Sequence, residues 1–424
     1  MRRNILTSKS GLIQIFVLFF LFFGSIELQA QNVVIRSLRC YSSNDQILFP
    51  VIDATDPSHS SITIEFDVAN NFLPSVNLLF RFCDKNWKPY ESAFLINPGY
   101  NTEYNLFFER LPSTVTNANF HYKGTFPNNN VTFPFSGKWM YFIVDPQDKN
   151  IVYGSGKFYV VYPQVKLRTS ITKERMEGKT PEPAELGRTI GIRTNFVLPD
   201  SLYPSQVGFI EIVENMKINQ PIKIDRSSYG IDKFYEWNGS NSFSFVARQL
   251  QPGNEYRQTD FRDVGNFPPG TINAQKPGIE VSDFFKLNPP DYNGASILTN
   301  YRDKYADYLH VNFKLRPPEN IKSPIFLVGS FTDWKVLPDY EMYDDNGLMN
   351  LSVLLKRGIY DYQYVTADYS GNEIKNVDWY ILEGNFWETK NIYHIFLFYE
   401  TTELGGYDKI IGHIEYKSGE LWAN

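Results

Sequence analysis

Ile62-Thr63-Ile64-Glu65-Phe66-Asp67-Val68 alternates large apolar side chains with polar ones along its whole length. A period of two places the four apolar residues on one face of an extended chain and the three polar residues on the other. An amphipathic helix would instead repeat its apolar residues every three to four positions. The stretch therefore predicts a β-strand with one buried face.

Similar stretches surround this strand in the block that runs from about residue 33 to residue 161. They are short, alternating or rich in aromatic residues, and separated by clusters of Ser, Asn, Asp, Pro and Gly: 78–83, 105–108, 138–145 and 157–162. Short strands with regular turn signals are typical of an antiparallel β-sandwich. We therefore expect the first block to be a sandwich.

Two further sets of strand-like stretches follow, at 189–197, 207–213 and 242–247, and then at 309–315, 325–328, 351–355, 359–365 and 392–399. Between them, 251–278 is polar and rich in Pro and Gly, which fits either a long ordered connection or a lid. The stretch KLNPPDYNG (286–294) is a boundary signal. The sequence thus predicts an all-β chain with units at 31–165, 166–295 and 296–424.

The first thirty residues are typical of a secretory signal peptide. Basic residues precede an apolar run at 12–23, and 28–30 resembles a cleavage site with small residues. The run is short for a membrane span. An uncleaved N-terminal anchor is the alternative. Residue 31 is Gln rather than Cys, so no lipid anchor is expected.

The charge and cysteine content exclude some functions. Residues 1–30 carry three of the 41 basic and one of the 47 acidic residues, so the mature chain has a net charge of −8. This acidic balance argues against nucleic acid and anionic lipid as the main partners. Cys40 and Cys83 are the two cysteines, and a disulfide or two buried thiols are both compatible with an exported chain.

No catalytic, metal or cofactor motif emerges from the sequence. The five histidines have no spacing typical of metal ligands, and no nucleophile elbow is present: His59, His121, His310, His394 and His413. GSGK at 154–157 lacks the first glycine and the Ser or Thr of a phosphate-binding loop, so we interpret it as a turn. We expect no cofactor and no enzymatic activity.

The stretch GSFTDWK (329–335) introduces a resemblance. Together with DDNG (344–347), LSVLL (351–355) and GIYDYQYV (358–365), it resembles an early-set immunoglobulin-like domain of the glycogen-binding class. In such a domain Trp334 could stack on a sugar ring. The second Trp of a sugar platform is missing before Trp379, so packing of Trp334 over the end of the sandwich is the favoured interpretation.

Motifs along nearly the whole mature chain carry a second resemblance. They include FCDKNWKP (82–89), FPN (126–128), SGKWMY (136–141), LEGNFWETKN (382–391) and YDKIIG (407–412). Their types and order resemble the type IX secretion system plug protein family of Bacteroidota. The fold class implied by both resemblances is all-β, with tandem immunoglobulin-like β-sandwich domains and an early-set sandwich at 296–424.

This second resemblance implies a non-enzymatic periplasmic protein that associates peripherally with the outer membrane. Its implied partner is the outer-membrane β-barrel translocon of type IX secretion, whose periplasmic opening it would seal. Neither nucleic acid nor direct membrane insertion is expected, and carbohydrate is a secondary alternative through an exported glycan-binding role. A surface adhesin is a third hypothesis. The motif residues are expected to be structural or to face a partner: Asp84, Trp87, Trp139, Gly384, Asn385 and Trp387.

Overall fold

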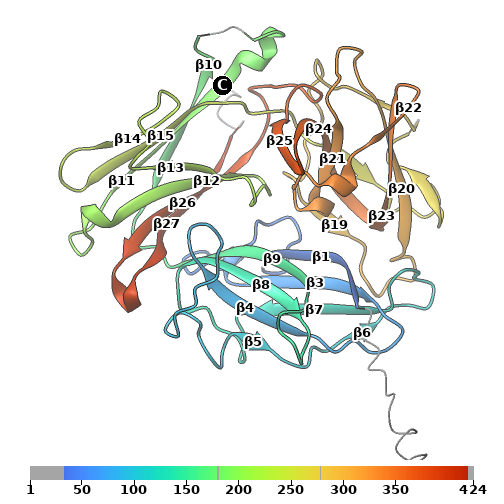
Figure 1. The fold of residues 1–424 in the computed structure, drawn as a ribbon, viewed down its shortest axis with the longest axis horizontal. Helices are drawn as coiled ribbons and strands as arrows, with labels where there is room; N and C mark the ends of the chain where they lie inside the picture. Colours follow the sequence, from blue (N-terminus) through green and yellow to red (C-terminus); the bar gives the residue numbers. More distant parts are fainter. Residues whose placement is uncertain (1–32, 179–180, 277, 419–424) are drawn as a thin grey trace, which may run out of the picture.

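The computed structural model describes residues 33–178, 181–276 and 278–418, which form six β-sheets. The predicted signal peptide lies outside these residues. The sheets pair into three β-sandwiches, and short 3-10 turns are the only helical elements within the described ranges. Figure 1 shows the first sandwich in blue and cyan, the middle one in green with two red strands, and the third in yellow to orange. The predicted all-β class is confirmed.

The first sandwich contains the alternating strand from which the sequence analysis starts. Its first sheet has the order β1 (Val34–Ser42), β3 (Ile62–Ala69), β7 (Phe120–Phe126) and β6 (Glu109–Arg110). Its second sheet has the order β2 (Val51–Asp53), β9 (Val152–Val161), β8 (Gly137–Val144), β4 (Asn77–Cys83) and β5 (Thr102–Glu103). The apolar face of β3 is buried in the core with the rings of Phe80 and Phe82. Each such side chain contributes about 1.5–3 kcal/mol through burial.

The middle sandwich is built from two separate parts of the chain. One sheet has the order β10 (Arg168–Arg175), β11 (Arg188–Val197), β15 (Ser242–Leu250) and β14 (Lys233–Trp237). The other has the order β13 (Ile222–Asp225), β12 (Val207–Glu214), β26 (Ile392–Thr401) and β27 (Tyr407–Lys417). The last two strands of the chain therefore complete the middle sandwich.

The third sandwich is inserted between β15 and β26. In one sheet β24 (Gly358–Ser370) pairs with β16 (Arg257–Asp260), β19 (Ser296–Leu298), β21 (Ile325–Gly329) and β25 (Glu373–Asp378). In the other, β20 (Tyr308–Arg316) pairs with β17 (Thr271–Asn273), β18 (Glu280–Val281) and β23 (Leu348–Lys356), and β23 pairs with β22 (Tyr343–Asp345). The chain thus enters this sandwich once and leaves it once.

Two expectations from the sequence need correction. The sequence places 392–399 in the C-terminal unit, but Ile210 of β12 faces Leu397 of β26, so sheet pairing crosses the boundary at 295/296. An apolar pattern identifies a strand but not its partner, and a long insertion adds little closure entropy. The stretch 105–108 is a loop rather than a strand, with Asn105 in the left-handed region at φ 52°.

Candidate functional site at the junctions between the sandwiches

The described residues hold no candidate metal centre. Among them, no group of three or more His, Cys, Asp or Glu side chains is placed to hold a metal ion. In the same part of the chain, no helix is long and apolar enough to cross a membrane. Buried ion pairs lie instead where the sandwiches meet. Most of the motif residues named from the sequence lie at these junctions, and their contacts there are described below.

The turn after β4 carries Asp84 and Trp87 to the junction between the first and middle sandwiches. Oδ1 of Asp84 accepts hydrogen bonds from the backbone of Asn86 at 2.8 Å and Lys88 at 2.9 Å, which closes the turn. The half-buried ring of Trp87 packs edge-on against Tyr159, with centroids 5.2 Å apart. Both motif residues are therefore structural here.

A buried ion pair lies beside this turn. Nζ of Lys138 donates to the carboxylate of Glu211 at 2.9 Å and to the carbonyl of Lys85 at 2.8 Å, and its charge lies 4.7 Å from the centre of the Trp87 ring. Burial lowers the pKa of Lys138 and raises the pKa of Glu211, which disfavours the charged form of both side chains. The opposite charge of the partner counters this effect at each side chain. The pair joins β8 of the first sandwich to β12 of the middle one.

A second buried charge joins the first sandwich to the third. Oδ2 of Asp67 accepts from Lys356 at 2.6 Å and from Tyr308 at 2.8 Å, and its Oδ1 lies 2.7 Å from Nδ1 of His121. Burial by itself would raise the pKa of Asp67, but the hydrogen bonds and charges of His121 and Lys356 outweigh it and hold that pKa below its ordinary value. The His121 ring also stacks on Tyr301 at 3.8 Å.

The stretch 383–391 crosses back from the third sandwich to the middle one. Gly384 has φ 89°, and a Cβ there would lie 2.6 Å from the carbonyl oxygen of Phe284, so the backbone needs glycine. Nδ2 of the fully buried Asn385 donates to the carbonyl of Arg188 at 2.7 Å, and its Oδ1 accepts from the N–H of Gly253 at 3.0 Å. Asn385 thereby ties the returning chain to the outgoing one.

Trp387 fixes the same crossing on the middle sandwich. Its Nε1 donates to the carbonyl of Thr189 at 2.8 Å, and the guanidinium of Arg175 lies 5.2 Å from its ring centre. The ring is half-buried against the core of that sandwich. Gly384, Asn385 and Trp387 therefore act as a clasp between two sandwiches.

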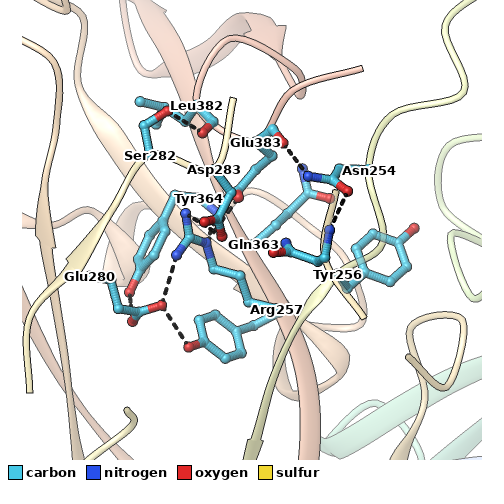
Figure 2. A network of polar contacts seen from close by, with 12 residues as sticks. Asn254, Tyr256, Arg257, Glu280, Ser282, Asp283, Gln363, Tyr364, Leu382 and Glu383 are labelled. Carbon is cyan, nitrogen blue, oxygen red and sulfur yellow. Dashed lines mark hydrogen bonds and ion pairs between the residues drawn. The ribbon is translucent and has the colours of Figure 1, made fainter. Parts of the chain in front are cut away.

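Arg257 forms the centre of a buried network beside the clasp (Figure 2). Its guanidinium lies 3.0 Å from Glu280, 3.1 Å from Asp283 and 2.9 Å from Glu383. Burial raises the pKa of Glu280 and of Glu383, and the charge of Arg257 only partly offsets this. The carbonyl of Glu383 also accepts from Asn254 at 2.6 Å, so the network holds the outgoing and returning segments together.

The remaining motif residue and the two cysteines lie inside or beside the first sandwich. Trp139 is fully buried, and its Nε1 donates to the carbonyl of Phe135 at 2.9 Å. Cys40 on β1 and Cys83 on β4 belong to opposite sheets and are free thiols. Burial raises the pKa of Cys83 to about 12. Cys40 lines a cavity of about 250 Å³ where all three sandwiches meet.

Trp334 is the alternative candidate for sugar stacking, and its burial agrees with the favoured interpretation that it packs in the sandwich. The residue is 1% exposed, its Nε1 donates to the carbonyl of Gly294 at 2.8 Å, and its ring packs on Tyr256 with centroids 4.2 Å apart. Two successive left-handed residues, Asp333 and Trp334 itself at φ 56°, turn the ring into the core. A buried ring has no free face for a sugar.

The burial of Trp334 gives a testable result. We expect no heat of binding when the protein is titrated with α-glucan oligosaccharides to about 1 mM, because the Trp334 ring is not presented to the ligand. Trp334→Ala should instead lower the free energy of unfolding by about 3–5 kcal/mol, since it removes a large buried ring. Saturable binding that disappears in Trp334→Phe would contradict this assignment.

Comparison with known proteins agrees with this geometry. Residues 35–162, which span the first sandwich, match the family described as "Type 9 secretion system plug protein 1st domain". No curated protein matches the chain. A crystal structure of a hypothetical protein from Parabacteroides merdae ATCC 43184 is similar, with a TM-score of 0.74 and 18% identity over 91% of this chain and 97% of that chain.

This similarity shows that the whole three-sandwich fold has a counterpart among solved structures, and at this identity it shows the fold alone. A marsupial T cell receptor covers 91% of this chain and 99% of its own at 9% identity, but its TM-score of 0.19 supports no argument. The first sandwich is thus similar to the first domain of type IX secretion system plug proteins.

Proposed function

We propose that the protein is a non-enzymatic periplasmic plug that associates with the outer membrane and seals the periplasmic opening of the type IX secretion translocon when no substrate is engaged. The observation that carries this proposal is the match of residues 35–162 to the first domain of such plugs. A first domain of this kind supports a part in type IX secretion.

The junctions support the mechanical part of this role. A stopper for a wide barrel has to resist deformation, and sandwiches joined by flexible linkers would move relative to one another. Here Lys138–Glu211 joins the first sandwich to the middle one, Lys356–Asp67 joins the first to the third, and Asn385 ties the chain returning from the third sandwich to the middle one. Both ion pairs and Asn385 are buried, so the surrounding core holds their geometry.

Affinity purification tests the proposed partner. The tagged protein, solubilised with a mild detergent from its own envelope, is expected to recover the giant barrel of the translocon. A tagged periplasmic protein of similar size serves as the control for carry-over. Recovery of other translocon components without the barrel, in repeated preparations, would contradict the plug role. Protection of the protein from protease added to intact cells distinguishes it from a surface adhesin.

A further inference from the structure

Three loops lie at one end of the first sandwich. Two of them connect its two sheets, and the third connects two strands of the same sheet. The loops are 70–76 from β3 to β4, 104–108 from β5 to β6, and 145–151 from β8 to β9. Asn77 at the start of β4 faces Val144, and Leu78 faces Glu103, so all three loops leave the sheets at the same end. We call this the loop end.

The loop end exposes apolar side chains from each of its loops. Phe72 is 74% exposed and Phe107 is 80% exposed. Large apolar side chains exposed on the three loops or at their borders are Phe72, Leu73, Tyr104, Phe107, Ile151 and Val152. A soluble protein normally keeps such rings covered, and a group of them marks an interaction surface.

Charge at the loop end is low, with a net charge of −1 over the three loops. The loops 70–76 and 104–108 contain no charged residue. The loop 145–151 adds Asp145, Asp148 and Lys149, of which the side chain of Asp145 accepts a hydrogen bond from Tyr153 at 3.0 Å. The chain as a whole carries a net charge of −6. The loop end therefore suits a neutral partner and gives no attraction for an anionic one.

The three loops lie apart from the contacts between sandwiches, and the neighbouring segment 111–119 at the same end contacts the third sandwich through Thr114 and Thr116. The opposite end of β4, where Cys83 faces Lys138, leads into the junction with the middle sandwich. The third sandwich covers the sheet that carries Asp67, through Lys356 and Tyr308. The exposed rings of Phe72 and Phe107 remain outside both contacts.

We propose that the loop end inserts shallowly into a zwitterionic phospholipid surface. Rings that project from the tips of separate loops fit the interfacial layer of a bilayer, which accepts aromatic and aliphatic side chains at any spacing. A protein partner would instead need pockets that match each projecting ring. This contact is peripheral and does not involve a membrane-spanning segment. It goes beyond the proposed plug role, because it requires lipid alone and no barrel.

Co-sedimentation with vesicles of phosphatidylethanolamine and phosphatidylcholine tests the proposal. The protein is expected to sediment with these vesicles, and Phe72→Ser/Phe107→Ser should weaken the apparent affinity at least about tenfold, since most of the buried apolar area is lost. The matched control is Tyr229→Ser/Phe285→Ser, which replaces two rings that are each 77% exposed on the other two sandwiches. The control should bind as the original protein does, and all variants should keep the same unfolding midpoint.

Four outcomes would overturn the lipid contact: no sedimentation of the original protein, equal loss in both double variants, no loss in the loop-end variant, or binding that appears only when anionic phosphatidylglycerol is added. Recovery of the barrel is measured separately in detergent. The lipid proposal would also be overturned if the original protein does not sediment with vesicles and the loop-end variant no longer recovers the barrel. That result would show that the loop end contacts a protein. Vesicle binding with failed barrel recovery would contradict only the plug role.

Discussion

Arg257→Met is expected to lower the free energy of unfolding by about 3–5 kcal/mol, because it removes the cation of a buried network. The variant leaves Glu280, Asp283 and Glu383 in an interior where Arg257 is their common partner. Methionine fills much of the space of the arginine stem, so the loss reports charge rather than volume. Urea unfolding followed by tryptophan fluorescence measures it.

The pH dependence of this variant has a defined sign. The pKa values of Glu280 and Glu383 are raised by burial, and removing Arg257 raises them further. A carboxyl whose pKa is higher in the folded than in the unfolded chain favours folding at low pH and loses that contribution as the pH rises through its folded pKa. The destabilisation by Arg257→Met should therefore be largest near pH 8 and shrink as the pH falls towards about 5.

Arg262→Met is the matched control for Arg257→Met. Arg262 lies 2.7 Å from Asp260, but the two side chains are 48% and 43% exposed. An exposed pair of this kind contributes about 0–1 kcal/mol, so the control should stay close to the original protein at every pH. Equal effects of the two substitutions, or a loss in Arg257→Met that grows as the pH falls, would show that the buried network does not stabilise the crossing.

The sequence predicts the strands well where one face alternates. Ile62 and Phe66 on β3, and the strands at 309–315 and 359–365, lie where their patterns place them. The stretch 105–108 forms no strand, because Phe108 packs in the core from a loop while its neighbour Phe107 is 80% exposed. An apolar run shows what a segment can bury, and only the tertiary contacts decide whether it does.

The junctions could not be predicted from the same patterns. Asp67 and Glu65 occupy the polar phase of β3, which in a single sandwich would face water, yet both are buried because the third sandwich covers that face. Glu211 interrupts the apolar run of β12 and is buried by the first sandwich in the same way. A single charged residue within a strand pattern is the signal that could have suggested these contacts. It does not indicate which segment of the chain lies against that residue.

The motif at 382–391 shows the same limit. The sequence indicates that its glycine, asparagine and tryptophan matter, and the structure shows that Gly384 and Asn385 hold two crossing segments together. Arg257, the centre of that crossing, lies 126 residues before Glu383 along the chain. Such a pairing depends on the tertiary fold, which the local sequence pattern does not contain.

Lys138→Met should destabilise the junction between the first and middle sandwiches by about 3–5 kcal/mol, because it leaves Glu211 buried without a cation. Both side chains are nearly inaccessible, at 2% and 3% exposure. The unfolding midpoint measures this loss. As a second measurement, limited proteolysis should show earlier cleavage between the first two sandwiches. Lys85→Met is the matched control, since Lys85 pairs with Glu400 at 3.3 Å across the same junction but in solvent.

The double variant Lys138→Met/Glu211→Leu separates the charge from the contact. Replacing both members of a buried ion pair with apolar residues of similar volume is often neutral, whereas removing one member is costly. The double variant should therefore regain most of the stability that Lys138→Met loses, because the introduced methionine side chain would still pack on Trp87 next to Tyr159. The opposite outcome is a double variant whose loss in free energy of unfolding equals the sum of the losses of the two single variants. In that case the ion pair itself would specify how the sandwiches dock. Apolar packing at this junction would then be insufficient to hold the plug rigid.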